Sequence, residues 1–227
     1  MALFSKLFLD TADTSVIKEQ FKLGLIDGVT TNPTLIMKSG RNPEDVYQEL
    51  LDFGIPDLSM EVVGDREAML KEGRRLSQKF GAAATIKLPC TVDGLAVCKA
   101  LSDEEVNTNV TLIFSPAQAL LAAKAGATYV SPFVGRVDDQ SFDGIKLIKE
   151  ISSIFVQGAS TTQILAASVR TVRQVTDSFL AGADLVTLPP AVLSKMYNHI
   201  LTDAGLAQFE KDWASVPSNT KPCSPPN

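Results

Sequence analysis

Short apolar runs of four to six residues recur along the chain about every twenty to thirty residues, and more polar stretches separate them. Runs of this length, bounded by glycine, proline or charged residues, are typical of buried strands. We therefore expect eight strands, at 7–11, 28–31, 58–63, 83–88, 109–114, 128–133, 164–168 and 184–188.

The stretches between the runs carry helix start and stop signals. Segments 65–80, 117–125 and 171–181 each end at a glycine, and Ser115-Pro116 supplies a cap and a first-turn proline to the second of them. Strands that alternate with helices pair in parallel. The longest gap between runs predicts a loop at 135–144 and a helix around 145–151, and the C-terminal part predicts helix-like stretches at 193–201 and 205–213.

Eight strand–helix units in 227 residues favour a single closed (β/α)8 barrel. The predicted domain covers 1–214 with its C-terminal helix, and the Pro- and Ser-rich segment 215–227 predicts a flexible, disordered tail. An open doubly wound sheet is the alternative, but no Gly-x-Gly-x-x-Gly follows the first run.

Composition and charge exclude several kinds of protein. The net charge is −5 and there is no basic patch rich in aromatic residues, which argues against a nucleic-acid binder. The apolar segment 1–9 has no cleavage-site pattern, and no apolar run approaches the length needed to span a membrane. We expect a cytoplasmic protein without nucleic-acid or membrane partners.

The residues available for chemistry are also limited. Cys90, Cys98 and Cys223 lack the spacing of metal ligands, and His199 is the single histidine, within the helix-like stretch 193–201. Zinc sites, Cys-His nucleophiles and Ser-His-Asp triads are therefore not expected, and neither a metal nor another cofactor is predicted. We interpret Cys90 as a small buried apolar residue.

Lys87 is the most unusual residue, because it lies inside the apolar run 83–88, just before Pro89. An ammonium ion in a packed core costs several kcal/mol unless it is paired or loses its proton. The neutral amine attacks carbonyl groups, so Lys87 is the candidate Schiff-base nucleophile. Alternatively, Lys87 is a strand-end lysine that reaches solvent or pairs with a carboxylate.

Further polar residues follow the two-residue period of the strands towards their carboxyl ends. In a (β/α)8 barrel these ends form the active site. Each residue taken singly also fits a structural role, as a polar group hydrogen-bonded at a strand end. The residues are Asp10, Asn32, Glu61, Asn109, Thr111, Ser131, Ser168 and Arg170.

Six segments of the chain resemble the transaldolase family in its short form, which includes fructose-6-phosphate aldolase. The Thr-Thr-Asn-Pro turn and the Ser-Pro-Phe-Val-Gly-Arg strand are the most specific. The segments are Leu9-Asp10-Thr11, Gly28-Val29-Thr30-Thr31-Asn32-Pro33, Ile86-Lys87-Leu88-Pro89, Asn109-Val110-Thr111, Ser131-Pro132-Phe133-Val134-Gly135-Arg136 and Ala167-Ser168-Val169-Arg170.

The resemblance implies a metal-free class I enzyme that moves a dihydroxyacetone unit between sugar phosphates, from sedoheptulose 7-phosphate to glyceraldehyde 3-phosphate. It implies that Lys87 attacks the ketone and that Asp10 is the general base. It further implies that Glu61 and Thr111 position a water for carbinolamine dehydration and imine hydrolysis.

Substrate binding is assigned by the same resemblance. Asn32, Asn109 and Ser131 would hold the hydroxyls of the retained three-carbon fragment, and Phe133 would also contact the substrate. Arginine forks suit bidentate phosphate contact, so Arg136 and Arg170 would bind the phosphate. Ser168 would add a hydroxyl donor to that phosphate, and a surface ion pair is the alternative for each arginine.

Two positions distinguish the branches of the family. The aldolase branch has glutamine where Glu61 stands and tyrosine where Phe133 stands, so both residues favour a transaldolase. The alternatives are a fructose-6-phosphate aldolase that releases free dihydroxyacetone and a non-catalytic barrel that binds sugar phosphates. The resemblance also implies a ring-like homo-oligomer, with a decamer as one form.

Overall fold

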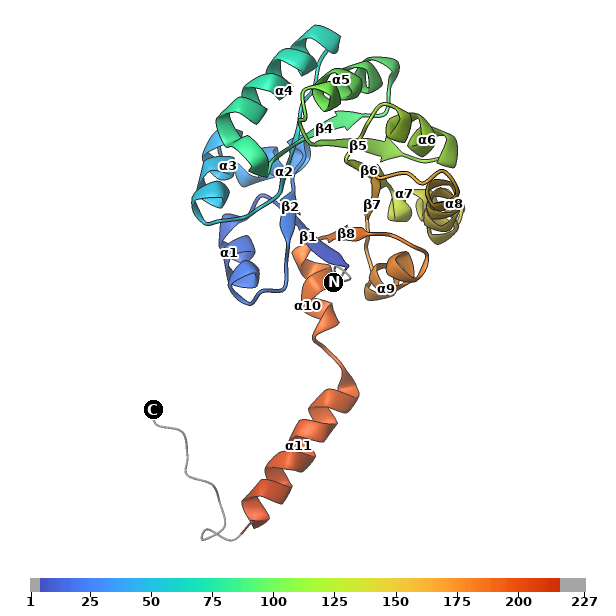
Figure 1. The fold of residues 1–227 in the computed structure, drawn as a ribbon. Coiled ribbons are helices and arrows are strands. Elements are labelled where there is room, and N and C mark those ends of the chain that lie inside the picture. Colours follow the sequence, from blue (N-terminus) through green and yellow to red (C-terminus); the bar gives the residue numbers. More distant parts are fainter. Residues whose placement is uncertain (1–4, 217–227) are drawn as a thin grey trace.

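The computed structural model describes residues 5–216, in which eight parallel strands close into a barrel in the order β1 to β8 (Figure 1). Because β8 pairs with β1, the (β/α)8 fold is confirmed and the open sheet is wrong. The strands are β1 Lys6–Asp10, β2 Gly28–Thr30, β3 Leu58–Glu61, β4 Ala84–Pro89, β5 Thr108–Ile113, β6 Tyr129–Pro132, β7 Gln163–Ala166 and β8 Leu185–Leu188.

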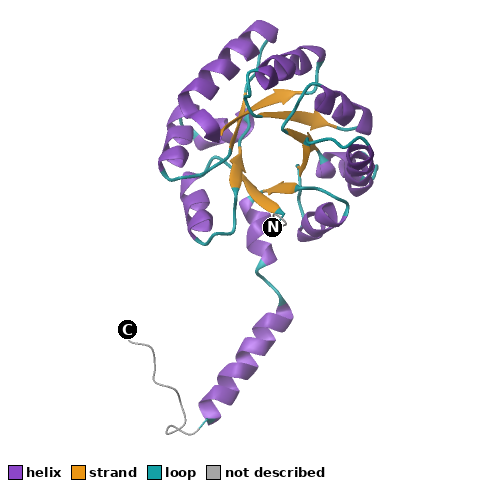
Figure 2. Ribbon diagram, viewed as in Figure 1, coloured by secondary structure: helices purple, strands orange, loops and turns teal. Residues whose placement is uncertain are grey.

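Helices surround the barrel, and α11 projects away from it (Figure 2). The helices are α1 Thr14–Lys22, α2 Pro33–Ser39, α3 Pro43–Asp52, α4 Arg66–Phe80, α5 Val92–Asp103, α6 Pro116–Lys124, α7 Val134–Asp139, α8 Gly144–Gln157, α9 Val172–Leu180, α10 Pro190–Met196 and α11 Ile200–Ser215, with a 3-10 turn η1 Gly81–Ala83. The predicted tail 215–227 lies outside the described residues from position 217 onward, as does Cys223.

The predicted helix ends are confirmed at α6, where the Ser115 hydroxyl accepts a hydrogen bond from the Gln118 amide at 3.3 Å. The cap satisfies an amide that has no partner within the helix. After α6 the chain turns at Gly126, which has a φ of +87° that side chains disfavour.

The predicted loop at 135–144 is wrong in its first half, because α7 covers positions 135–139. The amides of Val134 and Gly135 donate to the carbonyls of Ala167 and Ser168 at 2.9 and 3.1 Å. These contacts with the residues that follow β7 satisfy first-turn amides that no side chain caps. The predicted helix around 145–151 is confirmed but longer, as α8.

The predicted helical stretch 193–201 is also wrong, because α10 ends at Met196 and α11 begins at Ile200. His199 lies between them with extended backbone at φ −147°, and its Nδ1 accepts a hydrogen bond from the Leu201 amide at 3.2 Å. His199 therefore starts a helix instead of continuing one.

Apolar side chains form two layers of core. The larger layer lies between the strands and the helices and includes Leu9, Met60 and Ile86. The smaller layer fills the inside of the barrel and includes Phe8 and Leu185. The inside of the barrel is polar towards the carboxyl ends of the strands, where the candidate site lies.

Candidate active site

A cavity of about 350 Å³ opens at the carboxyl ends of the strands. Nine of the eleven residues proposed from the sequence line it, whereas Asn109 and Arg170 do not. The nine are Asp10, Asn32, Glu61, Lys87, Thr111, Ser131, Phe133, Arg136 and Ser168.

Lys87 lies between Glu61 and Asn109 in the strand register, so three neighbouring strands bring these side chains together. Lys87 is 6% exposed, which excludes the interpretation that its ammonium reaches bulk solvent. Its Nζ lies 3.1 Å from Glu61 Oε2 and donates to the Thr31 carbonyl at 3.1 Å. The alternative of a carboxylate-paired lysine therefore describes this state, and the partner is a residue that also lines the cavity.

Asp10 ends β1, and Thr30 holds its carboxylate through a hydrogen bond. The Thr30 hydroxyl donates to Asp10 Oδ1 at 2.8 Å and lies 2.6 Å from the Thr187 hydroxyl. Burial raises the pKa of Asp10 above its ordinary value, although the Lys87 ammonium and the Thr30 hydrogen bond oppose the rise. The carboxylate is therefore a stronger base than an exposed aspartate.

Thr111 presents a buried hydroxyl that has no hydrogen-bond partner among the described residues. It lies opposite Pro89 of β4, and β5 becomes irregular immediately afterwards. The next residue, Leu112, has a φ of +59°, which is strained for a side chain of this kind. A cavity-facing hydroxyl without a protein partner is free to bind water or substrate.

The amide residues lie at different depths. Asn109 is fully buried, donates to Ser59 Oγ at 3.2 Å and accepts a hydrogen bond from Ser131 Oγ at 2.6 Å. Asn109 therefore reaches the cavity through Ser131 instead of lining it. Asn32 caps α2 by accepting from the Leu35 amide at 3.0 Å, which leaves its NH₂ group for the cavity.

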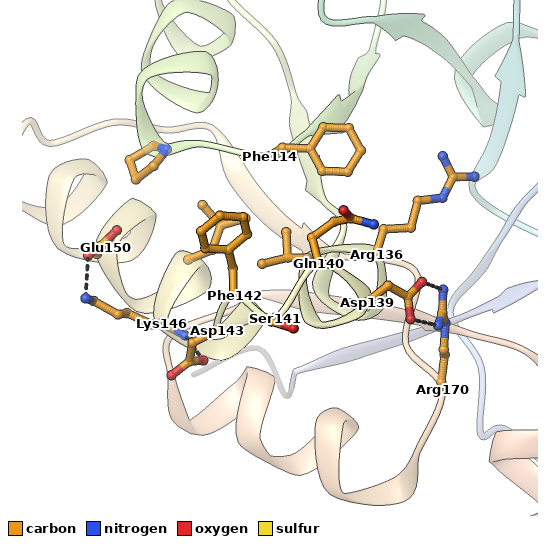
Figure 3. A pocket seen from close by; sticks show the side chains of 13 residues that line it. Phe114, Arg136, Asp139, Gln140, Ser141, Phe142, Asp143, Lys146, Glu150 and Arg170 are labelled. Carbon is orange, nitrogen blue, oxygen red and sulfur yellow. Dashed lines mark hydrogen bonds and ion pairs between the residues drawn. The ribbon is translucent and has the colours of Figure 1, made fainter.

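Of the two arginines proposed to bind phosphate, only Arg136 lines the cavity that holds Lys87. Arg136 lines the cavity, with its guanidinium 4.9 Å from the centre of the Phe133 ring. Ser168 and Arg170 follow the end of β7, and Ser168 lines the cavity with a φ of +58°. Arg170 instead lines a neighbouring cavity of about 870 Å³, where it pairs with Asp139 (Figure 3). Arg136 lines both cavities.

Several polar residues were missed by sequence reasoning. Thr30 and Thr187 line the cavity beneath Asp10, and Ser59 supports Asn109. Their position within predicted strands could have identified Thr30, Ser59 and Thr187 as barrel-facing. No pattern points to Asp139, because it lies within the predicted loop 135–144.

Within residues 5–216, no three His, Cys, Asp or Glu side chains gather as a group that could hold a metal ion. In the same part of the chain, no helix combines the length and apolar character needed to cross a membrane.

Comparison with known proteins adds a second line of information. A family model described as transaldolase/fructose-6-phosphate aldolase matches residues 7–220. A probable transaldolase of Caulobacter vibrioides is 54% identical over 212 residues, which are 93% of this chain and 97% of that protein. Probable transaldolases of Paracoccus denitrificans (93% of this chain, 97% of that protein) and Aquifex aeolicus (93% and 98%) are 52% and 51% identical.

Proposed function

The chain belongs to the transaldolase/fructose-6-phosphate aldolase family, and from this premise we propose that it is a class I transaldolase acting through an imine on Lys87. The reaction converts sedoheptulose 7-phosphate and glyceraldehyde 3-phosphate into erythrose 4-phosphate and fructose 6-phosphate. The observation that carries this proposal is the buried Lys87 amine, 3.1 Å from Glu61, on a cavity that Asp10 also lines.

In the first step, the Lys87 amine adds to the C2 carbonyl of the ketose phosphate and forms a carbinolamine. Glu61 is close enough to take a proton from the ammonium and make the amine nucleophilic. Loss of water from the carbinolamine then gives the protonated imine. Glu61 and the unpartnered Thr111 hydroxyl are suited to hold that water, both when it leaves and when it later attacks the imine.

In the second step, Asp10 takes the proton of the C4 hydroxyl. The electrons of the C3–C4 bond move into the imine, which becomes an enamine, and the first aldehyde phosphate leaves. The raised pKa of Asp10 supports this role, because a more basic carboxylate accepts the hydroxyl proton more readily as the C3–C4 bond breaks. With the second aldehyde the steps run in reverse, and Asp10 returns the proton to the new hydroxyl.

The three-carbon fragment has to stay in place between the two aldehydes. We assign the Asn32 amide and the Ser131 hydroxyl to its hydroxyl groups, since both residues line the cavity. Asn109 orients Ser131 by accepting its hydrogen bond at 2.6 Å. The phosphate is assigned to Arg136 and Ser168 on the cavity, with Arg170 on the neighbouring wall.

Trapping tests the imine directly. Incubation with fructose 6-phosphate and borohydride should add the reduced three-carbon fragment to the peptide that contains Lys87, as measured by mass spectrometry. Lys87→Ala should abolish both trapping and turnover, whereas Lys146→Ala, on the neighbouring cavity, should keep trapping. A label on another lysine would contradict the mechanism.

Transfer and cleavage separate the proposed enzyme from an aldolase. We expect transfer from fructose 6-phosphate to erythrose 4-phosphate to be much faster than release of free dihydroxyacetone. The carboxylate of Glu61 and the phenyl ring of Phe133 support this expectation, because neither side chain donates a proton to the enamine. Glu61→Gln with Phe133→Tyr should shift the ratio towards release. Equal rates with and without acceptor would favour the aldolase.

The proposal extends to the cellular setting and to assembly. We assign the chain to the pentose phosphate pathway in the cytoplasm, with residues 1–214 as one catalytic domain. We further propose a ring-like homo-oligomer. Support comes from α11, which bears no buried residue and projects from the barrel (Figure 1).

A further inference from the structure

Arg170 is held by a carboxylate of its own chain (Figure 3). Its Nη1 donates to Asp139 Oδ1, and its Nη2 donates to Asp139 Oδ2 at 2.6 Å. Both ends of the guanidinium fork are therefore used, in the bidentate geometry that a phosphate also adopts.

The remaining side of the fork faces the backbone of α7. A Cβ at Gly135 would lie 2.9 Å from Arg170 Nε, so this nitrogen lies beside the helix. A phosphate that takes both ends of the fork therefore has to displace Asp139.

Neighbouring contacts keep Asp139 beside Arg170. Gln174 accepts a hydrogen bond from the Arg170 amide at 2.8 Å and donates to Asp138 Oδ2 at 2.6 Å. These bonds tie α7 to the loop that carries Arg170. The hydrogen bond from Arg170 lowers the pKa of Asp139, so the carboxylate is charged at neutral pH.

The pair is also easy to open. The side chains of Arg170 and Asp139 are 49% and 46% exposed, and ion pairs this exposed contribute little to stability. A phosphate carries up to two charges and three acceptor oxygens, so it can replace the carboxylate on the same donors.

We propose that Asp139 is an internal competitor for the phosphate site and sets the affinity of Arg170 for phosphorylated substrates. The inference rests on the proposed function, because it takes Arg170 as part of the phosphate grip. Binding is weakened by the fraction of molecules in which Asp139 occupies the fork. Removing the competitor should strengthen phosphate binding without accelerating the chemical step.

Asp139→Asn tests this in the full-length protein, with inorganic phosphate as a competitive inhibitor of transfer. We expect the inhibition constant for phosphate and the KM for fructose 6-phosphate each to fall about three- to fivefold, the range set by a weak exposed pair. The kcat should not rise. Glu150→Gln is the matched control, since Glu150 lines the same cavity but pairs with Lys146 at 3.8 Å.

Arg170→Ala separates the role of Asp139 as a competitor from the role of Arg170 in binding phosphate. It should raise the inhibition constant for phosphate, and Asp139→Asn should have no further effect in that background. An unchanged constant in Asp139→Asn, an equal fall in Glu150→Gln, or a fall that persists without Arg170 would overturn the role of Asp139 alone. If Arg170→Ala leaves phosphate inhibition unchanged, the phosphate assignment of Arg170 fails as well.

Discussion

Asp10 is a half-buried carboxylate whose pKa is set by opposing neighbours. Burial raises the pKa most, Lys87 and the Thr30 hydrogen bond lower it, and Glu61 raises it again. As a general base Asp10 works in its charged form, so kcat/KM should fall as the pH drops through this raised pKa. Asp10→Asn should remove that acid limb together with most of the activity.

Thr30→Val tests the cause of the shift. Without the 2.8 Å hydrogen bond the charged form of Asp10 is less stable, so its pKa should rise further. The acid limb of the kcat/KM profile should move to higher pH. Thr187→Val is the control, because it removes the partner of Thr30 but leaves the bond to Asp10. Equal movement in both variants would mean that the hydrogen bond is not the cause.

Thr111 should matter for activity more than for stability. Its hydroxyl makes no hydrogen bond to another described residue, so removing it breaks no bond within that part of the chain. Thr111→Val should therefore change the free energy of unfolding in urea by less than about 1 kcal/mol while lowering kcat.

Thr85→Val provides the contrast, because the buried Thr85 hydroxyl donates to half-buried Asp57 at 2.8 Å. This variant should lose about 1–3 kcal/mol of stability. A Thr111→Val protein that is destabilised as much as Thr85→Val would show that the Thr111 hydroxyl has a protein partner.

At the residue scale, the sequence predicted cavity residues where strand period alone decides orientation. Lys87 and Glu61 are examples, because both lie within strands near their carboxyl ends. The depth of a side chain below the cavity and its pairing with distant residues were not predictable. Asn109 lies beneath Ser131, and Arg170 pairs with Asp139, a residue 31 positions earlier in the chain.

At the scale of elements, helices were predictable where local caps define them and not where tertiary contacts do. Helix α6 carries Ser115 and Pro116 at its start, and both are visible in the sequence. Helix α7 has no side-chain cap, and its first amides donate to carbonyls in the loop after β7. A contact between segments more than 30 positions apart leaves no local pattern.

The contact between α7 and the loop after β7 requires glycine at position 135. A Cβ at this position would lie 2.2 Å from the Ser168 carbonyl oxygen, which accepts the Gly135 amide hydrogen bond. Gly135→Ala should push α7 away and lower the free energy of unfolding by about 1–3 kcal/mol. It should also raise KM for fructose 6-phosphate more than KM for unphosphorylated dihydroxyacetone donors.

Gly205→Ala is the matched glycine control. Apart from its chain neighbours and the backbone of its own helix, no described atom lies within 4 Å of the added methyl group, and Gly205 is inside α11. Alanine should favour the helix by about 1 kcal/mol and leave both KM values unchanged. Similar losses in the two variants would show that α7 does not depend on its close approach to the loop after β7.

At the scale of the molecule, the barrel is self-contained but α11 is not. None of its residues is buried, and isolated helices of about this length are marginally stable in water. Leu206, Phe209 and Trp213 are spaced three and four residues apart, so they form one apolar stripe, and they are 55%, 70% and 51% exposed. A stripe of this kind is stabilised when another copy of the chain covers it.

We therefore expect a solution mass of two or more chains of 24.3 kDa each, measured by size-exclusion chromatography with light scattering. Phe209→Glu with Trp213→Glu places charges in the stripe and should lower the mass, while the barrel keeps its unfolding transition. Gln208→Glu with Lys211→Glu alters the opposite face of α11 and should leave the mass unchanged. A wild-type protein of 24.3 kDa, or a stripe variant that keeps the full mass, would exclude assembly through α11.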